Sequence, residues 1–470
     1  MASEVMEKKK KSGDTNMTVG KPLPLILRFV IPLFIGNIFQ QFYNMVDSVI
    51  VGRFVGADAL GAVGSTGTIM FLLLGFGTGL ASGFAVLPAQ QYGAGSFREM
   101  KKSVANGILL SLVVSVITTA VGAIFMHPLL HLMNTPEEIY DYAYSYIIWI
   151  VYGTIAIVFY NLFAAILRAV GNSKVPLFFL ILSAVLNIFL DLLCIVAFHM
   201  GTMGAAVATD VSQGISAILS FVYIWKKFPM LVPEREDWHF HHEATKKQMG
   251  VGLPMGLQFA ITASGTIVMQ SAINLFGATA ISAFTAGAKL TGILTQGFPS
   301  LGQAMATYCA QNYGKGEFAR IKTGVRQSAY VSTAYALIAL GLTVLLLKPM
   351  LLLFFGSGVD ISAYLPYAKT YTYLSGIFYI PLGFIFVYRN AMQGLGMGFL
   401  PMVGGIVEFL ARIACAIVAM AVKIYAVAAF CDPAAWIAAG IYFVIAYRLS
   451  MKRFMKEQQE SAEFRQLNRM

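Results

Sequence analysis

Twelve long apolar stretches, separated by short polar loops, constrain this sequence more than any other feature. A membrane-spanning helix needs about twenty predominantly apolar residues. We predict spans at 25–52, 60–88, 104–126, 140–166, 176–198, 203–225, 250–275, 280–308, 326–347, 364–388, 400–421 and 425–447. Only 12% of the residues are charged, against about a quarter in a soluble domain. The sequence therefore predicts an all-α polytopic membrane protein.

The basic residues predict the orientation of these spans. If the N-terminus is cytoplasmic, 27 of the 33 Lys and Arg residues fall in segments on the inner side. Short cytoplasmic loops carry an excess of these residues. We therefore predict a multi-pass protein of the plasma or inner cell membrane with both termini in the cytoplasm. The net charge of +11 is then a topology signal, and we expect no nucleic-acid partner.

The second half of the chain repeats the first. The segment Ala-Gln-Gln-Tyr-Gly-Ala-Gly-Ser-Phe at 89–97 returns as Ala-Gln-Asn-Tyr-Gly-Lys-Gly-Glu-Phe at 310–318. Because each half holds six spans, both enter the membrane in the same direction and the repeat is parallel. We predict two six-helix bundles related by a pseudo-two-fold axis. Their expected limits are an N-terminal lobe at 25–225 and a C-terminal lobe at 249–450, with a cytoplasmic linker at 226–248 and cytoplasmic tails at 1–24 and 451–470.

This architecture is typical of transporters, which bind their substrates between two such bundles. No polar loop is long enough to contain an ATP-binding domain, so we expect a secondary transporter and not an enzyme. The four cysteines are scattered and form no CxxC motif. We interpret them as small packing residues rather than a disulfide framework or a metal site. No cofactor is expected.

Ionisable residues inside the predicted spans mark candidate functional positions. Asp47 and Asp191 each lie fifteen residues after a proline in an outward-running span, so both carboxyl groups are expected at the same depth. Asn187 lies one turn below Asp191 on the same helix face, and Thr209 reaches that depth on the following span. Such a cluster could bind Na⁺ or share one proton. The alternative is that each side chain only caps or bridges helices through backbone hydrogen bonds.

Other charged residues within the spans leave more alternatives open. Asp210 could join the same cavity, pair with Lys289 or be satisfied by water. Lys289 itself could line the cavity of the C-terminal half. Glu408 and Arg412 are spaced for a salt bridge on one helix face, which we expect them to form.

Several of these residues lie in motifs that resemble those of the multidrug and toxic compound extrusion (MATE) family. The motifs are Gln41-Phe-Tyr-Asn-Met-Val-Asp-Ser-Val-Ile-Val-Gly, Ala89-Gln-Gln-Tyr-Gly, Leu167-Arg-Ala-Val-Gly, Asn187-Ile-Phe-Leu-Asp and Gly204-Ala-Ala-Val-Ala-Thr. The resemblance extends over about residues 20–450. It implies two six-helix lobes that alternate between outward and inward states around a central cavity. It also implies coupling-cation ligands at Asp47, Asn187, Asp191 and Thr209, and we add Gln41 to the candidate cavity-lining residues.

The resemblance further implies export of organic cations or amphipathic toxic compounds in exchange for inward Na⁺ or H⁺. The sequence departs from one branch of the family, because the seventh span lacks an acidic residue and the tenth has none in its interior. Coupling is therefore expected in the N-terminal lobe. The alternative function is that of a flippase for a lipid-linked or amphipathic metabolite. Apart from a small organic substrate and the lipid bilayer we expect no partner, and the protein is predicted to be a monomer.

Overall fold

The computed structural model describes residues 15–133, 135–355 and 360–467, which form helices and no strand. Residues 1–14 and 468–470 of the predicted tails lie outside this part. The described chain divides into two compact units. Unit 1 is Ile31–Ala260 with Met1–Asn16, and unit 2 is Met17–Val30 with Ile261–Met470, as far as these ranges are described. The predicted lobe limits stay a prediction.

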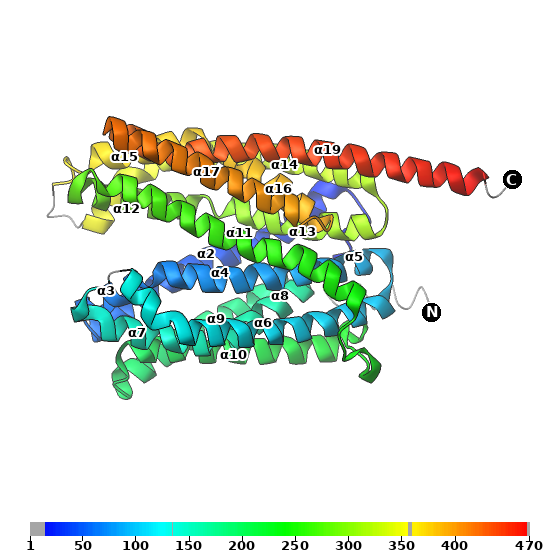
Figure 1. Cartoon of the computed structure of the whole chain (residues 1–470), viewed down its shortest axis with the longest axis horizontal. Coiled ribbons are helices and arrows are strands. Elements are labelled where there is room, and N and C mark those ends of the chain that lie inside the picture. The colour runs from blue at the N-terminus through cyan, green and yellow to red at the C-terminus, as the bar shows by residue number, and fades with distance from the viewer. Residues whose placement is uncertain (1–14, 134, 356–359, 468–470) are drawn as a thin grey trace. The chain divides into compact units, whose positions relative to one another are not determined.

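The helices of unit 1 follow the order of the first six predicted spans (Figure 1). After α2 (Pro22–Phe54) come α3 (Ala57–Ser65), α4 (Gly67–Phe84), α5 (Val86–Ala94), α6 (Phe97–Leu132), α7 (Glu137–Tyr152), α8 (Thr154–Ala169), α9 (Lys174–Leu192), the π-helix η1 (Leu193–Ala197), α10 (Gly201–Lys227) and the short 3-10 helices η2 (Pro229–Leu231) and η3 (Arg235–Asp237).

Unit 2 follows through α11 (His242–Asn274), the first part of which belongs to unit 1. Its further helices are α12 (Gly277–Leu294), α13 (Gly297–Gly314), α14 (Phe318–Phe355), α15 (Leu365–Ile377), α16 (Tyr379–Gly394), α17 (Phe399–Val422), α18 (Tyr425–Ala429) and α19 (Cys431–Leu467). The last predicted span is therefore continuous in α19 despite the Asp432-Pro433 pair near its start.

The predicted spans correspond to these helices, with several of them broken into segments. Within the described residues, nine helices are long and apolar enough to cross a membrane, or eleven if two bent pairs each form one span. These pairs are α7 with α8 and α15 with α16, and each is bent by 49°. The predicted span at 280–308 is covered by α12 and α13. Neither of these two helices is among the described helices that are long and apolar enough by this test.

Small residues let α4 and the first part of α11 pack backbone to backbone within unit 1. A Cβ atom placed on Gly83 would collide with the Cα atom of Gly252, and one on Gly79 would collide with the backbone of Met255 and Gly256. Glycines at four-residue spacing allow such close approach between helices in membranes. The start of α11 is thereby fixed to unit 1, although the rest of this helix belongs to unit 2.

Hydrogen bonds in turn attach the segment before α2 to unit 2. The Asn312 side chain donates to the carbonyl oxygen of Met17 at 3.1 Å, and Gln311 accepts from the Met17 amide at 2.9 Å. Arg320 donates to the carbonyl oxygens of Met17 and Gly20 at 3.2 and 2.8 Å. Gln311 and Asn312 lie near the end of α13, in the repeated segment 310–318. The end of α13 therefore holds the entry to the first helix.

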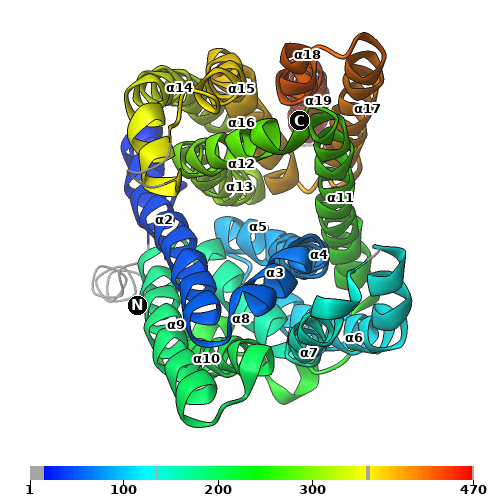
Figure 2. The same cartoon turned by 90° about the vertical axis from the view of Figure 1, so that its left-hand side faces the viewer.

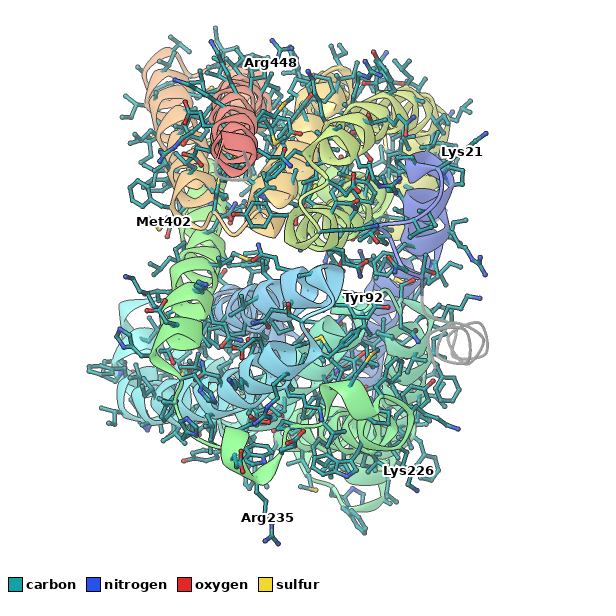
Figure 3. All side chains as sticks on the ribbon, turned by 90° about the vertical axis from the view of Figure 1, so that its right-hand side faces the viewer. Lys21, Tyr92, Lys226, Arg235, Met402 and Arg448 are labelled. Atoms are coloured by element: carbon teal, nitrogen blue, oxygen red, sulfur yellow. The ribbon has the colours of Figure 1, made fainter. Side chains whose placement is uncertain are left out.

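The linker before α11 is held in unit 1 by charged groups instead. Arg98 on α6 donates to both carboxylate oxygens of Asp237 at 2.7 and 2.8 Å. Lys101 donates to Glu234 at 2.8 Å. Figure 3 shows this end of unit 1, where Lys226 and Arg235 project from α10 and the linker.

Candidate functional site

Three helices of unit 1 bring the four predicted cation ligands together. Asp47 lies on α2, Asn187 and Asp191 lie on α9, and Thr209 lies on α10. The side chains of Asn187 and Asp191 are inaccessible to solvent, and Asp47 is 8% exposed. The helix faces therefore agree with the common depth that the sequence predicted.

Asn187 joins α9 to α10 within the cluster. The side-chain amide of Asn187 is oriented so that both its nitrogen and its oxygen have partners. In this orientation the nitrogen donates to Asp191 Oδ2 at 2.9 Å. Its oxygen then accepts from the Thr209 hydroxyl at 3.2 Å and from the Thr209 backbone amide at 3.1 Å. Tyr43 adds a further hydroxyl, 3.4 Å from Thr209 Oγ1. Sequence analysis missed Tyr43, although its position one turn before Asp47 on α2 places it on the same helix face.

The carboxyl groups of Asp47 and Asp191 lie against each other within hydrogen-bonding range. Two ionised carboxylates at this separation in an apolar interior repel strongly, so the pair needs either one shared proton or a bound cation. The Oδ1 atoms of both residues are buried without a hydrogen-bond partner. Buried polar atoms are normally paired, which makes these two oxygens candidate ligand atoms.

A change of helix type follows the cluster directly. α9 ends at Leu192, and the chain continues as a π-helix, η1, whose five-residue hydrogen bond runs from the Phe198 amide to the carbonyl oxygen of Leu193 at 3.0 Å. Single π-helical turns are frequent at functional sites. Asp191 stands immediately before this irregular turn.

Asp210 occupies a separate niche beside the cluster. Its carboxyl group fills the space where a Cβ atom would stand at Gly153, between α7 and α8, and its Oδ1 atom is buried without a partner. The two remaining candidates are more open, because the side chains of Gln41 on α2 and Lys289 on α12 are exposed within the described residues. Asp210 belongs to unit 1 and Lys289 to unit 2.

Comparison with known proteins identifies the family. The family model described as MatE matches residues 32–193 and 254–418. The chain belongs to the MATE family. It is 31% identical over 308 residues to the probable multidrug resistance protein YpnP of Bacillus subtilis, covering 65% of this chain and 68% of that protein. It is 23% identical over 318 residues to the FAD transporter of Shewanella oneidensis, covering 67% of this chain and 70% of that protein.

Solved structures of MATE and related transporters share the fold. A MOP superfamily transporter from Pyrococcus furiosus superposes with a TM-score of 0.87 at 21% identity, over 94% of this chain and 98% of the other. An outward-facing MATE multidrug transporter superposes with a TM-score of 0.86 at 20% identity, over 93% and 98%. This likeness confirms the predicted class of twelve membrane-spanning helices in two bundles. The protein is a multi-pass membrane transporter.

Unit 2 of this MATE transporter contains its own buried charges, arranged differently from those of unit 1. Arg412 Nη2 donates to Glu408 Oε1 at 2.9 Å, which confirms the predicted salt bridge on α17. Its Nε donates to Asp432 Oδ1 on α19 at 3.0 Å, and the Tyr371 hydroxyl donates to Asp432 Oδ2 at 3.3 Å. Sequence analysis missed the pairing of Asp432, because this residue lies on another helix.

The two units thus present different chemistry to a cation. Unit 1 offers carboxyl, amide and hydroxyl oxygens with no positive side chain among Asp47, Asn187, Asp191 and Thr209. Such oxygen ligands suit hard cations. No cluster of three or more His, Cys, Asp or Glu side chains arranged for a metal ion occurs within the described ranges. The set in unit 1 mixes acidic with neutral oxygen donors, so it suits a singly charged cation or a proton.

Proposed function

We propose that this protein is a secondary antiporter that exports organic cations or amphipathic toxic compounds in exchange for inward Na⁺ or H⁺. The observation that carries the proposal is the buried pair of Asp47 and Asp191, with two unpartnered carboxyl oxygens. In the bilayer interior, a group of this kind is stable only when it holds a proton or a cation. Its occupancy therefore responds to the ion gradient across the membrane.

Asn187 and Thr209 give the pair the geometry of an ion site. The Asn187 amide fixes one oxygen of Asp191 by hydrogen bonding, which leaves the other oxygen directed to the ligand. Thr209 fixes the amide in turn. When the ion binds, it neutralises the charge on the carboxyl pair and favours a different packing of α2 against α9 and α10. A transporter couples the ion to its substrate if the two ligands favour different conformations.

Family membership supports export of small organic compounds. Several relatives are described as multidrug resistance proteins, and one is described as an FAD transporter. Related chains are therefore described both with multidrug resistance and with FAD transport. For this chain we propose an organic cation, because the buried charge of unit 1 is negative and exchange of like charges preserves the balance.

The test is transport in proteoliposomes that contain the purified protein and ethidium as the probe. An imposed inward gradient of Na⁺ at constant pH, or of H⁺ without Na⁺, should drive ethidium movement against its gradient. Asp47→Asn and Asp191→Asn should each reduce the driven rate at least about tenfold, since each removes a charge that binds the coupling ion.

Asp141→Asn is the matched control, because Asp141 is an exposed carboxylate on α7 of the same unit. This variant should transport at the wild-type rate. Gradient-driven transport by both site variants at that rate, with correct folding shown by gel filtration, would refute the coupling site. Transport of FAD but not of ethidium would instead refute the proposed substrate class.

We propose that the protein acts as a monomer in the plasma or inner cell membrane, with both termini in the cytoplasm. Basic residues concentrated in the predicted inner loops support this orientation. Light scattering in detergent measures the oligomeric state, and proteolysis of the C-terminal tail in sealed vesicles measures the orientation. A stable dimer or a tail cleaved from outside intact cells would contradict the respective part of the proposal.

A further inference from the structure

Two of the four cysteines, sixteen positions apart in the chain, meet in unit 2. Cys415 lies on α17 and Cys431 is the first residue of α19. Both thiols are directed at the carbonyl oxygen of Val427 on α18, with Sγ–O distances of 3.3 Å for Cys415 and 4.0 Å for Cys431. This shared acceptor places the two thiol groups beside each other. Neither is part of a disulfide in this structure.

The neighbouring ion pair holds the two helices in the register that brings these thiols together. Arg412 precedes Cys415 by three residues and therefore lies on the same face of α17. Asp432 is adjacent to Cys431, and the Arg412–Asp432 contact joins α17 to α19 at 3.0 Å. The ion pair and the thiol pair thus form two successive links between the same helices. A buried ion pair restricts sliding, so the thiols keep facing each other.

Small residues around the thiols allow the backbones to approach closely. The apolar cluster at this place includes Ala416, Ala419, Ala428 and Ala429, all buried. Figure 2 shows α17, α18 and α19 side by side at one corner of unit 2. A disulfide requires Cα atoms about 4.4–6.8 Å apart, and helices that pack through alanine and cysteine reach such separations more readily than helices that pack through leucine.

We propose that Cys415 and Cys431 form a redox-active dithiol that closes to an intramolecular disulfide linking α17 to α19. The oxidant is an external two-electron acceptor of the disulfide, quinone or diazene class. Each thiol loses its S–H hydrogen, a bond forms between the two sulfur atoms, and the acceptor takes up two electrons and two protons. The product ties together the α17–α18–α19 turn. This inference does not depend on the proposed transport activity.

The experiment treats the purified full-length protein in detergent with diamide, a diazene. One thiol adds to the nitrogen–nitrogen double bond, and the second displaces the hydrazine product as the disulfide forms. The remaining thiols are then labelled with a maleimide after denaturation and counted by mass spectrometry. The wild type should lose two of its four thiols, and a peptide pair linked through Cys415 and Cys431 should be found. Dithiothreitol should restore all of them.

Variants in which individual cysteines are replaced by serine identify the two cysteines that form the disulfide. A Cys194→Ser/Cys309→Ser double variant should still lose two thiols, because its cysteines at 415 and 431 are intact. Cys415→Ser should lose none, and its melting temperature should not respond to diamide, whereas that of the wild type should rise by a few degrees. The proposal is overturned if the folded wild type keeps four thiols or if the linked peptides contain other cysteines. Disulfides between different chains would overturn it as well.

Discussion

The two units differ in the groups that surround their buried carboxyl pairs. Each holds a buried pair of carboxyl groups on different helices within the predicted spans: Asp47 and Asp191 in unit 1, and Glu408 and Asp432 in unit 2. In unit 2 the guanidinium group of Arg412 lies between the carboxylates and bonds to both. In unit 1 the nearest partners of Asp191 are the neutral Asn187 and the other carboxyl group.

This difference assigns separate roles to units that share one helix order. A carboxylate in a membrane interior needs a positive partner or a proton. In unit 2 the positive charge belongs to the side chain of Arg412, which is part of the protein and cannot dissociate. Unit 1 lacks such a residue at its cluster, so under the proposed function its cation comes from solution. On this proposal unit 2 balances its buried charge without an ion, and unit 1 responds to ions.

The largest expected effect comes from removing the tethered cation. Arg412→Met should destabilise the protein by about 3–5 kcal/mol, because it leaves two buried carboxylates unpaired. Thermal unfolding of the purified protein in detergent measures the change. Arg448→Met, at an exposed position on α19, is the control and should remain close to the wild type.

A triple variant tests whether the loss comes from unpaired charge. Adding Glu408→Gln and Asp432→Asn to Arg412→Met should restore much of the stability, since no charge then remains buried in this network. A single Arg412→Met change that costs less than about 1 kcal/mol would show that the network is hydrated and weak. Unit 2 would then no longer differ from unit 1 in the way described.

A smaller effect is expected from the neutral side chain that organises the cation site. Asn187→Ala removes the donor to Asp191 Oδ2 and leaves that oxygen unpaired, at a cost of about 1–3 kcal/mol in a buried setting. The concentration of coupling ion that gives half-maximal transport should therefore rise at least about fivefold. It is measured by titrating Na⁺ at fixed pH and by titrating pH without Na⁺. An unchanged half-maximal concentration in both titrations would remove Asn187 from the site.

The sequence predicted features that depend on distance along a helix and missed those that depend on contacts between helices. Asp47 and Asp191 were expected at one depth because the rise per residue of a helix is constant. Their convergence in the structure follows from that regularity. The pairing of Asp432 with Arg412 could not be predicted in this way, since it depends on how α17 and α19 are rotated against each other.

The contacts that attach the segments before α2 and α11 could not be predicted from the sequence either. The repeated segment around Gln311 and Asn312 was recognised as a duplication, but its hydrogen bonds to Met17 were not expected. Nothing local marks residues 17–20 as a bound segment. The two cysteines on α17 and α19 were likewise interpreted as separate packing residues, because their sixteen-residue spacing matches no known motif.

The bent helix pairs allow a further comparison between the units. α7 and α8 meet at Gly153, and α15 and α16 meet at Phe378, with the same 49° bend. Gly153 has φ −80° and ψ 0°, which any residue adopts. The bend therefore does not require glycine, and we infer that the missing side chain serves to accommodate Asp210.

Gly153→Ala should consequently destabilise unit 1 by about 1–3 kcal/mol, because the added methyl group overlaps the Asp210 carboxyl group. Adding Asp210→Ala to Gly153→Ala should remove most of this loss of stability. Phe378→Ala is the comparison variant, because it changes the size of the side chain at the corresponding bend of unit 2. A double-mutant cycle from thermal unfolding measures the coupling. If the two substitutions are additive, Gly153 has a role unrelated to Asp210.

The smallest effect is expected where the entry segments are attached. In unit 1 the attachment consists of ion pairs from Arg98 and Lys101 to the linker, whereas in unit 2 Arg320 donates mainly to backbone carbonyl oxygens. Raising the salt concentration weakens exposed ion pairs. Amide exchange in residues 229–241 should therefore accelerate with salt, by up to about fivefold, and exchange in residues 17–20 should respond less.

The pH dependence of this attachment has a defined sign. The hydrogen bond from Lys101, with the charge of Arg98, holds the pKa of Glu234 below its ordinary value. A carboxyl group with a lowered pKa stabilises the folded state above its ordinary pKa and loses this contribution as the pH falls through the lowered value. After division by the intrinsic exchange rate at each pH, exchange in residues 229–241 should thus be insensitive to Glu234 between pH 7 and about pH 5 and should increase only at lower pH. Glu234→Gln should exchange at the faster rate throughout, whereas Glu243→Gln, at an exposed position on α11, should leave the profile unchanged. If the wild type accelerates near neutral pH, the attachment depends on a group other than Glu234, and the contrast between the two entry segments does not originate in these ion pairs.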